Sequence, residues 1–142
     1  MPDPVVEPAD DAPDVPDSVD PAAAAPHDDV IALGHLRLRW PILAAAPMVG
    51  QSDPAYRALM RRWGATLVYT EMLDAARFAD DPAYRAAALG RDGVAADDHP
   101  LVVQFAANEP EVLLAAGLAA QACGADAIDM CGCPRMNAVA PR

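Results

Sequence analysis

The sequence predicts an α/β protein in which parallel strands alternate with helices, and three observations lead to this class. Short apolar segments recur between residues 41 and 130, with room for a helix between most of them. The intervening segments carry helix-start signals, such as Asp53 before Pro54, and end at glycines. Strand and helix then alternate along the chain, which is typical of βαβ units and therefore of a parallel sheet.

The predicted strands are apolar, β-branched or aromatic runs. Runs without polar alternation are expected for strands that are buried on both faces of a sheet. The four predicted strands cover residues 41–47, 66–70, 101–105 and 125–130. Four strands of this kind fit either a doubly wound sheet or half of an eightfold barrel, since periodicity does not separate the two.

The first predicted helix begins at the N-cap Asp53 and ends at Gly64. Its apolar side chains recur at i, i+3, i+4 and i+7 and form one face, which is expected to be buried: Tyr56, Leu59, Met60 and Trp63. Three basic side chains lie away from this face: Arg57, Arg61 and Arg62. A second, short helix is expected over residues 82–89, before Gly90.

The last predicted helix has Asn108 as its N-cap, with Glu111 in the capping-box position, and it ends at Gly124. Its expected buried face consists of Val112, Ala115, Ala116, Ala119 and Cys123. Cys123 is therefore interpreted as a core residue.

Charge divides the chain at residue 29. Residues 1–29 hold nine acidic residues, no basic residue and seven of the fifteen prolines. A disordered acidic Pro-rich tail is expected here, because such a segment cannot bury a core; it is interpreted as a solvated leader, with an interaction arm as the alternative. Residues 30–142, which hold all ten arginines of the chain, are expected to form the globular domain.

The composition also bears on the cellular compartment. The acidic tail does not resemble a transit peptide, and no apolar run approaches the roughly 20 residues that a membrane crossing needs. Three cysteines, two of them separated by one glycine, do not suggest disulfides. We expect a cytoplasmic or nuclear protein that is not bound to a membrane.

Polar or reactive residues follow each predicted strand at its C-terminal end: Met48, Glu71, Gln104 and Cys133. This end is the ligand-binding edge in either parallel architecture. No dinucleotide-binding, Walker A or zinc-protease motif is present. The Cys131-x-Cys133 spacing has no second pair, so no metal is expected. Cys133 itself fits either an acid or nucleophile in a cleft or a small buried hydrophobe.

Five sequence blocks resemble the tRNA-dihydrouridine synthase family in order and spacing, over roughly residues 40 to 136. The finer pattern is similar to the branch that acts on tRNA positions 16 and 17, including Gln51-Ser52 and the segment from Val103 to Glu111. The blocks are Ala46-Pro47-Met48-Val49-Gly50, Arg62-Trp63-Gly64-Ala65, Tyr69-Thr70-Glu71-Met72, Leu101-Val102-Val103-Gln104-Phe105, and Ile128-Asp129 with Gly132-Cys133-Pro134.

The resemblance implies the first half, about four βα units, of a TIM (β/α)8 barrel that binds FMN. Family members reduce the C5–C6 bond of uridine in the D-loop of tRNA, with NADPH or NADH as the reductant. By position, Cys133 would give the proton to C5, while Pro47, Met48 and Gln104 would contact the flavin. Met48 could instead cap the core, Gln104 could satisfy a loop carbonyl, and Glu71 fits a surface acid equally well.

The resemblance also leads to expectations about this chain as it stands. It is interpreted as a truncated or partial form, which is not expected to catalyse the reaction or to bind tRNA by itself. Where the family commonly has an asparagine before Gly-Cys-Pro, this chain is one residue shorter and has Cys131 before Gly132. The alternatives are a non-catalytic remnant with a binding or regulatory role and another FMN-dependent barrel oxidoreductase.

Overall fold

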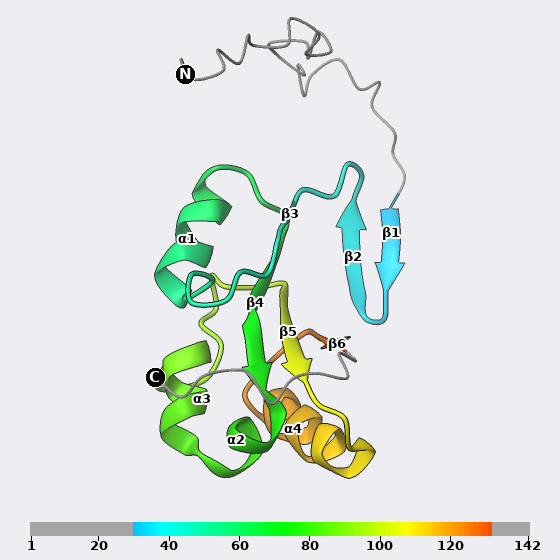
Figure 1. Ribbon diagram of the computed structural model, residues 1–142. Helices are drawn as coiled ribbons and strands as arrows, with labels where there is room; N and C mark the ends of the chain where they lie inside the picture. Colours follow the sequence, from blue (N-terminus) through cyan, green and yellow to red (C-terminus); the bar gives the residue numbers. More distant parts are fainter. Residues whose placement is uncertain (1–29, 132–142) are drawn as a thin grey trace, which may run out of the picture.

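The structure is a computed structural model that describes residues 30–131. A parallel sheet in the order β3-β4-β5-β6 forms its centre, and a separate antiparallel hairpin, β1-β2, precedes it. The hairpin lies beside the sheet, and helices α1 to α4 follow the strands (Figure 1). The elements are β1 (Val30–Leu33), β2 (Leu36–Arg39), β3 (Ala44–Ala45), α1 (Pro54–Arg62), β4 (Leu67–Asp74), α2 (Ala75–Asp80), α3 (Pro82–Leu89), β5 (Leu101–Ala106), α4 (Pro110–Ala122) and β6 (Ala127–Cys131).

The α/β prediction is confirmed over this range, with every pairing in the four-stranded sheet parallel. All four predicted strands and all three predicted helices are present, and the hairpin and α2 are additions that the sequence patterns did not predict. The acidic tail, residues 1–29, and the catalytic candidate Cys133 lie outside the described residues.

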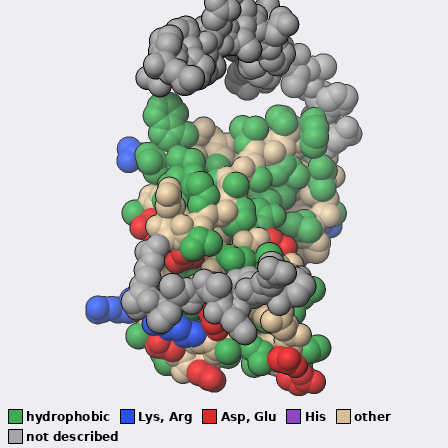
Figure 2. Space-filling model, viewed as in Figure 1, with side chains coloured by type: hydrophobic (Ala, Val, Ile, Leu, Met, Phe, Trp, Pro, Cys, Tyr) green, Lys and Arg blue, Asp and Glu red, His purple; other side chains and the backbone are tan. Residues whose placement is uncertain are grey.

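The two faces of the sheet bury different clusters. On the face toward the helices, alternate residues of β5 pack against α4 and α2, with the Phe105 and Phe78 rings in edge contact at 4.9 Å. On the opposite, inner face, Leu67 and Val102 form a second cluster with Leu38 of β2. The hairpin therefore covers the inner face where β4 and β5 begin. Figure 2 shows hydrophobic side chains over the hairpin and β3, and most charged ones near α2, α3 and α4.

The prediction of a strand over residues 41–47, buried on both faces, is wrong in length and in burial. Only Ala44–Ala45 pairs with β4, and Ala44 is exposed. Pro41 and Pro47 lack the N–H groups that a longer ladder would use. Within the described residues, β3 has a single neighbour, so it is an edge strand.

The predicted buried face of α1 is also wrong. Trp63 is 80% exposed and Leu59 is 48% exposed, whereas Arg57 is 1% exposed. The helix is rotated relative to the prediction because Arg57 finds a carboxylate and two carbonyl oxygens inside the protein. A guanidinium group with all these partners can be buried, which the apolar periodicity does not register.

Two details of α4 differ from expectation. Its N-cap is Glu109 rather than Asn108, and no side chain caps it. Ala116 and Ala120 are fully buried, while Ala115 is exposed. Leu114 and Leu118 consequently line a groove of about 740 Å³ that also includes Ile128 of β6.

Candidate functional site

The candidate site lies at the C-terminal edge of the sheet, on the inner face. It combines the loop after β3, the end of β4, Gln104 of β5 and Asp129 of β6. Gln104 and Asp129 lie two residues after Val102 and Ala127, which belong to the inner cluster. Because side chains alternate along a strand, all four side chains share that face.

Two side chains hold the loop of residues 46–52: Ser52, which belongs to the loop, and Glu71, which belongs to β4. Ser52 is 2% exposed, and its Oγ accepts a hydrogen bond from the Met48 N–H at 2.9 Å. The Met48 carbonyl oxygen accepts from the N–H groups of Gln51 and Ser52, both at 3.1 Å. The Gly50 N–H donates to a carboxylate oxygen of Glu71. The backbone around Met48 is therefore fixed on both sides of that residue.

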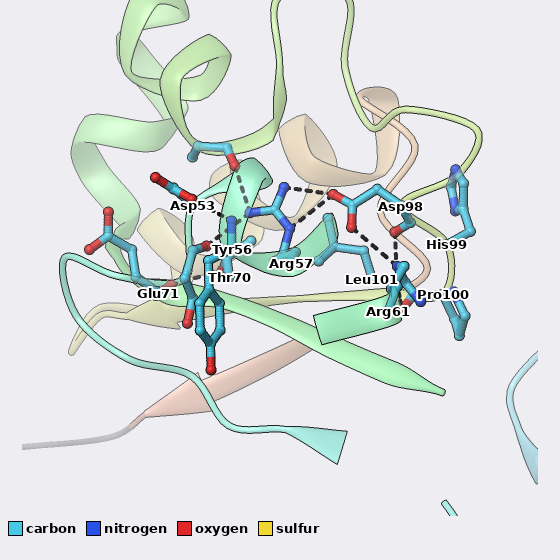
Figure 3. Close-up of polar contacts among 12 residues, drawn as sticks. Asp53, Tyr56, Arg57, Arg61, Thr70, Glu71, Asp98, His99, Pro100 and Leu101 are labelled. Carbon is cyan, nitrogen blue, oxygen red and sulfur yellow. Dashed lines mark hydrogen bonds and ion pairs between the residues drawn. The ribbon is translucent and has the colours of Figure 1, made fainter. Parts of the chain in front are cut away.

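A buried ion-pair network is bonded to the end of this loop (Figure 3). The Arg57 guanidinium group donates to the Ser52 carbonyl at 3.0 Å and to Oδ2 of Asp98 at 2.7 and 2.9 Å. Arg61 donates to the carbonyl oxygens of Asp98 and Pro100, at 2.8 and 2.9 Å. The segment that leads into β5 is thereby connected to the loop that carries Met48.

β4 contains a bulge beside the site. Tyr69 pairs with Val102 and Met72 pairs with Gln104, so β4 uses three steps where β5 uses two. The Gln104 N–H is bonded instead to Oγ1 of Thr70 at 3.1 Å, and this hydroxyl donates to the Glu71 carbonyl at 2.8 Å. Bulges often lie next to functional sites, where they redirect side chains.

Gln104 and Asp129 form the most direct side-chain contact of the site. They are register partners on β5 and β6, and Nε2 of Gln104 donates to Oδ2 of Asp129 at 2.6 Å. Both residues are half-buried. Within residues 30–131, the side-chain partner of Gln104 is thus a carboxylate and not the loop carbonyl that the sequence left as an alternative.

The predicted cofactor residues lie near the same edge. Pro47 and Met48 are half-buried in the loop, and Gln104 is half-buried on the inner face. Sequence reasoning left Glu71 open between site and surface, and its bond to Gly50 gives it a part in the loop. It overlooked Ser52 and the pairing of Asp129, although the position of Asp129 near the end of a strand was a usable signal.

A second polar cluster lies at the opposite end of the sheet. Asp126 accepts hydrogen bonds from the Leu101 N–H and contacts Nδ1 of His99, both at 2.7 Å, and it lies 3.6 Å from Nε2 of His35 in the hairpin turn. Burial raises the pKa of Asp126, but the Leu101 N–H and the histidine contacts outweigh it, and the net pKa is lowered. The cluster links the hairpin to the starts of β5 and β6.

Two further findings limit what the site can contain. In residues 30–131, no three His, Cys, Asp or Glu side chains come together in a way that could hold a metal ion. No helix of the same range combines the length and the apolar character that a membrane crossing needs.

A parallel sheet with polar side chains gathered at its C-terminal edge places the chain among α/β proteins, the class in which ligands commonly bind at this edge. The family model for dihydrouridine synthase (Dus) matches residues 43–140. This match covers more than half of the chain, which therefore belongs to the dihydrouridine synthase family. The prediction of a partial TIM barrel is confirmed by the family and by the four parallel strands.

Individual relatives agree with the family assignment. A tRNA-dihydrouridine(16/17) synthase-like protein of Rattus norvegicus is 53% identical over 94 residues, which are 66% of this chain and 21% of the relative. The tRNA-dihydrouridine(16/17) synthase of Saccharomyces cerevisiae is 50% identical over 97 residues, 67% of this chain and 22% of the relative. The chain thus spans about a fifth of the length of these relatives.

Proposed function

We propose that this chain supplies the first part of an FMN site that reduces the C5–C6 bond of uridine in the D-loop of tRNA, with NADPH or NADH as the reductant. The observation that supports the proposal most is the half-buried Gln104 carboxamide on the inner face of the sheet. A carboxamide can donate and accept at once, which fits the imide edge of a flavin ring.

Each site residue then has a role of its own. Pro47 and Met48 contact the flavin through a backbone that Ser52 and Glu71 hold in place. Gln104 orients the ring. Flavin, when bound, supplies the hydride for C6 of the uracil. Cys133 donates the proton to C5, a task that suits a thiol because its ordinary pKa near 8.5 keeps it mostly protonated at neutral pH.

The partners follow from the same proposal. tRNA is the substrate of the whole protein, at positions 16 and 17 by similarity to the named relatives. A tRNA substrate places the protein in the cytoplasm or the nucleus. Neither a metal ion nor a membrane takes part.

Flavin binding tests the first half of the proposal. Titration of FMN with the chain should quench flavin fluorescence with a saturable curve. Gln104→Leu should weaken binding roughly tenfold, since the flavin edge loses its hydrogen-bonding partner. Asp80→Asn, a change on the exposed end of α2, serves as the control. The absence of saturable quenching by the unmodified chain would contradict the proposal.

Activity is tested in a longer protein. Residues 43–140 replace the matching segment of the yeast relative, and dihydrouridine at positions 16 and 17 of tRNA is measured by mass spectrometry in cells that lack the native enzyme. We expect modified tRNA from the chimera and none from its Cys133→Ala variant. A folded, flavin-containing chimera without dihydrouridine would show that this segment does not support the reaction.

A further inference from the structure

We propose that Asp129 is a positioning residue that fixes which way the Gln104 carboxamide faces, so that the site offers a hydrogen-bond acceptor to an imide N–H of its ligand. This inference rests on the proposed function, because it concerns the same flavin-binding edge.

Gln104 and Asp129 are directly opposite in the β5-β6 register, and 2.6 Å separates Nε2 of Gln104 from Oδ2 of Asp129. An ionised carboxylate only accepts hydrogen bonds, so the amide nitrogen, and not the amide oxygen, must face it. A charged acceptor also makes this bond stronger than one between neutral groups. The orientation of the carboxamide is thus set by chemistry.

The backbone of Gln104 is held in place as well as its side chain. Its backbone N–H is bonded to Oγ1 of Thr70, which is 1% exposed, at the bulge of β4. The side chain therefore starts from a fixed point and ends at a fixed partner. Little freedom remains for the amide plane, and the orientation is in place before a ligand arrives.

Two groups of the Gln104 carboxamide remain for a ligand: Oε1 and the second hydrogen on Nε2. Within residues 30–131, Oε1 of Gln104 has no hydrogen-bond partner, and no side-chain nitrogen or oxygen in this range is both buried and unpaired. No described residue therefore competes with a ligand for Oε1. Together with the second hydrogen on Nε2, it forms an acceptor and donor pair in a fixed order. Polarisation by Asp129 strengthens Oε1 as an acceptor.

The ligand that fits this order has an imide N–H beside a carbonyl oxygen, as in the pyrimidine part of a flavin ring. Without the carboxylate, the carboxamide can rotate by half a turn and present its NH₂ group to the imide N–H, which leaves two donors facing each other. Asp129 thus acts on the ligand through Gln104 and does not need to touch it.

The test compares two probes and two carboxylates. FMN and 3-methyl-FMN, which lacks the imide hydrogen, are titrated against the full chain, Asp129→Asn and the control Asp80→Asn, with flavin fluorescence as the readout. The unmodified chain and Asp80→Asn should prefer FMN by roughly tenfold. Asp129→Asn should lose most of this preference through weaker FMN binding, with little change for 3-methyl-FMN.

The outcomes separate the inference from the proposed function. FMN binding with an unchanged preference in Asp129→Asn overturns the inference alone. No saturable FMN binding by the unmodified chain overturns both. A second readout needs no flavin: in the unmodified chain the NMR signals of the two Gln104 side-chain NH₂ hydrogens should lie far apart, because one hydrogen is bonded to a carboxylate, and in Asp129→Asn they should lie closer together. An unchanged separation in the variant would also overturn the inference.

Discussion

Arg57 and Asp98 are joined by a buried ion pair across 41 residues of sequence, with 2.7 Å between Nη2 and Oδ2. The pair connects α1 to the segment before β5, and the same guanidinium group holds the Ser52 carbonyl. A substitution of Asp98 should therefore lower the stability of the fold and disturb the loop that carries Met48.

Asp98→Ala should lower the free energy of unfolding by about 3–5 kcal/mol, because Arg57 is left as a buried charge without a counterion. Urea unfolding followed by circular dichroism measures the change. The double variant Arg57→Met with Asp98→Leu should recover part of the loss, and Arg91→Ala, at an exposed position, should change little. A loss below about 1 kcal/mol in Asp98→Ala would mean that water enters and solvates Arg57.

Ser52→Ala should cost about 1–3 kcal/mol, because the half-buried Met48 N–H loses its acceptor. The effect should be local as well as global. Hydrogen exchange at the Met48 amide should become faster than in the unmodified chain, whereas Ser52→Thr should keep the exchange slow if the added methyl group fits. Equal protection of Met48 in the alanine variant would contradict the assigned hydrogen bond.

Two glycines with nearly the same backbone angle provide a matched pair. Gly64 has φ +94° and an added Cβ meets nothing within 4 Å, while Gly93 has φ +93° and a Cβ would lie 2.7 Å from the Cys123 carbonyl oxygen. Gly64→Ala should cost only the backbone strain, about 1–2 kcal/mol. Gly93→Ala should cost clearly more, because backbone must move. Thermal unfolding compares them, and equal melting temperatures would contradict the contact at Gly93.

Asp126 should contribute to the free energy of unfolding by an amount that depends on pH. Its pKa in the folded chain is below the ordinary 3.8, so the unfolded chain binds the proton more readily. The contribution is therefore present above the unfolded pKa and is lost as the pH falls from about 5 through the folded pKa. Asp126→Asn should flatten this part of the stability profile, measured by urea unfolding from pH 6 downward. An unchanged acid slope would exclude Asp126 as its source.

The chain alone should not bind tRNA measurably at physiological salt. Phosphate contacts dominate such binding, and the net charge of −11 opposes it. Two of the ten arginines, Arg57 and Arg61, are also committed to the network around Asp98. Filter binding at several salt concentrations tests this expectation, and a curve that saturates at micromolar protein would contradict it.

The positions of the strands and helices along the chain could be predicted from sequence because apolar runs, prolines and glycines report local structure directly. The burial of Arg57 could not, because its partner Asp98 lies far away in sequence and an arginine is read as exposed by default. The hairpin could not be predicted either, because most of its side chains are not buried. Its residues Val30–Leu33 are all exposed, and only Leu38 of β2 enters the core.

The candidate site shows the same division. Met48 and Gln104 could be predicted because both follow strands and match a family pattern, and both of these signals can be read along the sequence alone. The Gln104 pairing with Asp129 depends on the register of β5 and β6, and the Thr70 contact depends on an irregularity of β4. Register and bulges are properties of paired strands, and one strand read alone does not contain them.

The bulge of β4 makes the number of residues between Tyr69 and Met72 matter as well as their identity. Thr70 reaches the Gln104 N–H only because β4 has one residue more than β5 between their shared pairings. Removing a single residue there would return the ladder to a regular spacing, with Met72 still opposite Gln104, but it would remove the irregularity that lets Thr70 reach the Gln104 N–H. Across related proteins, we expect this short stretch to keep its length together with a hydroxyl at the position of Thr70.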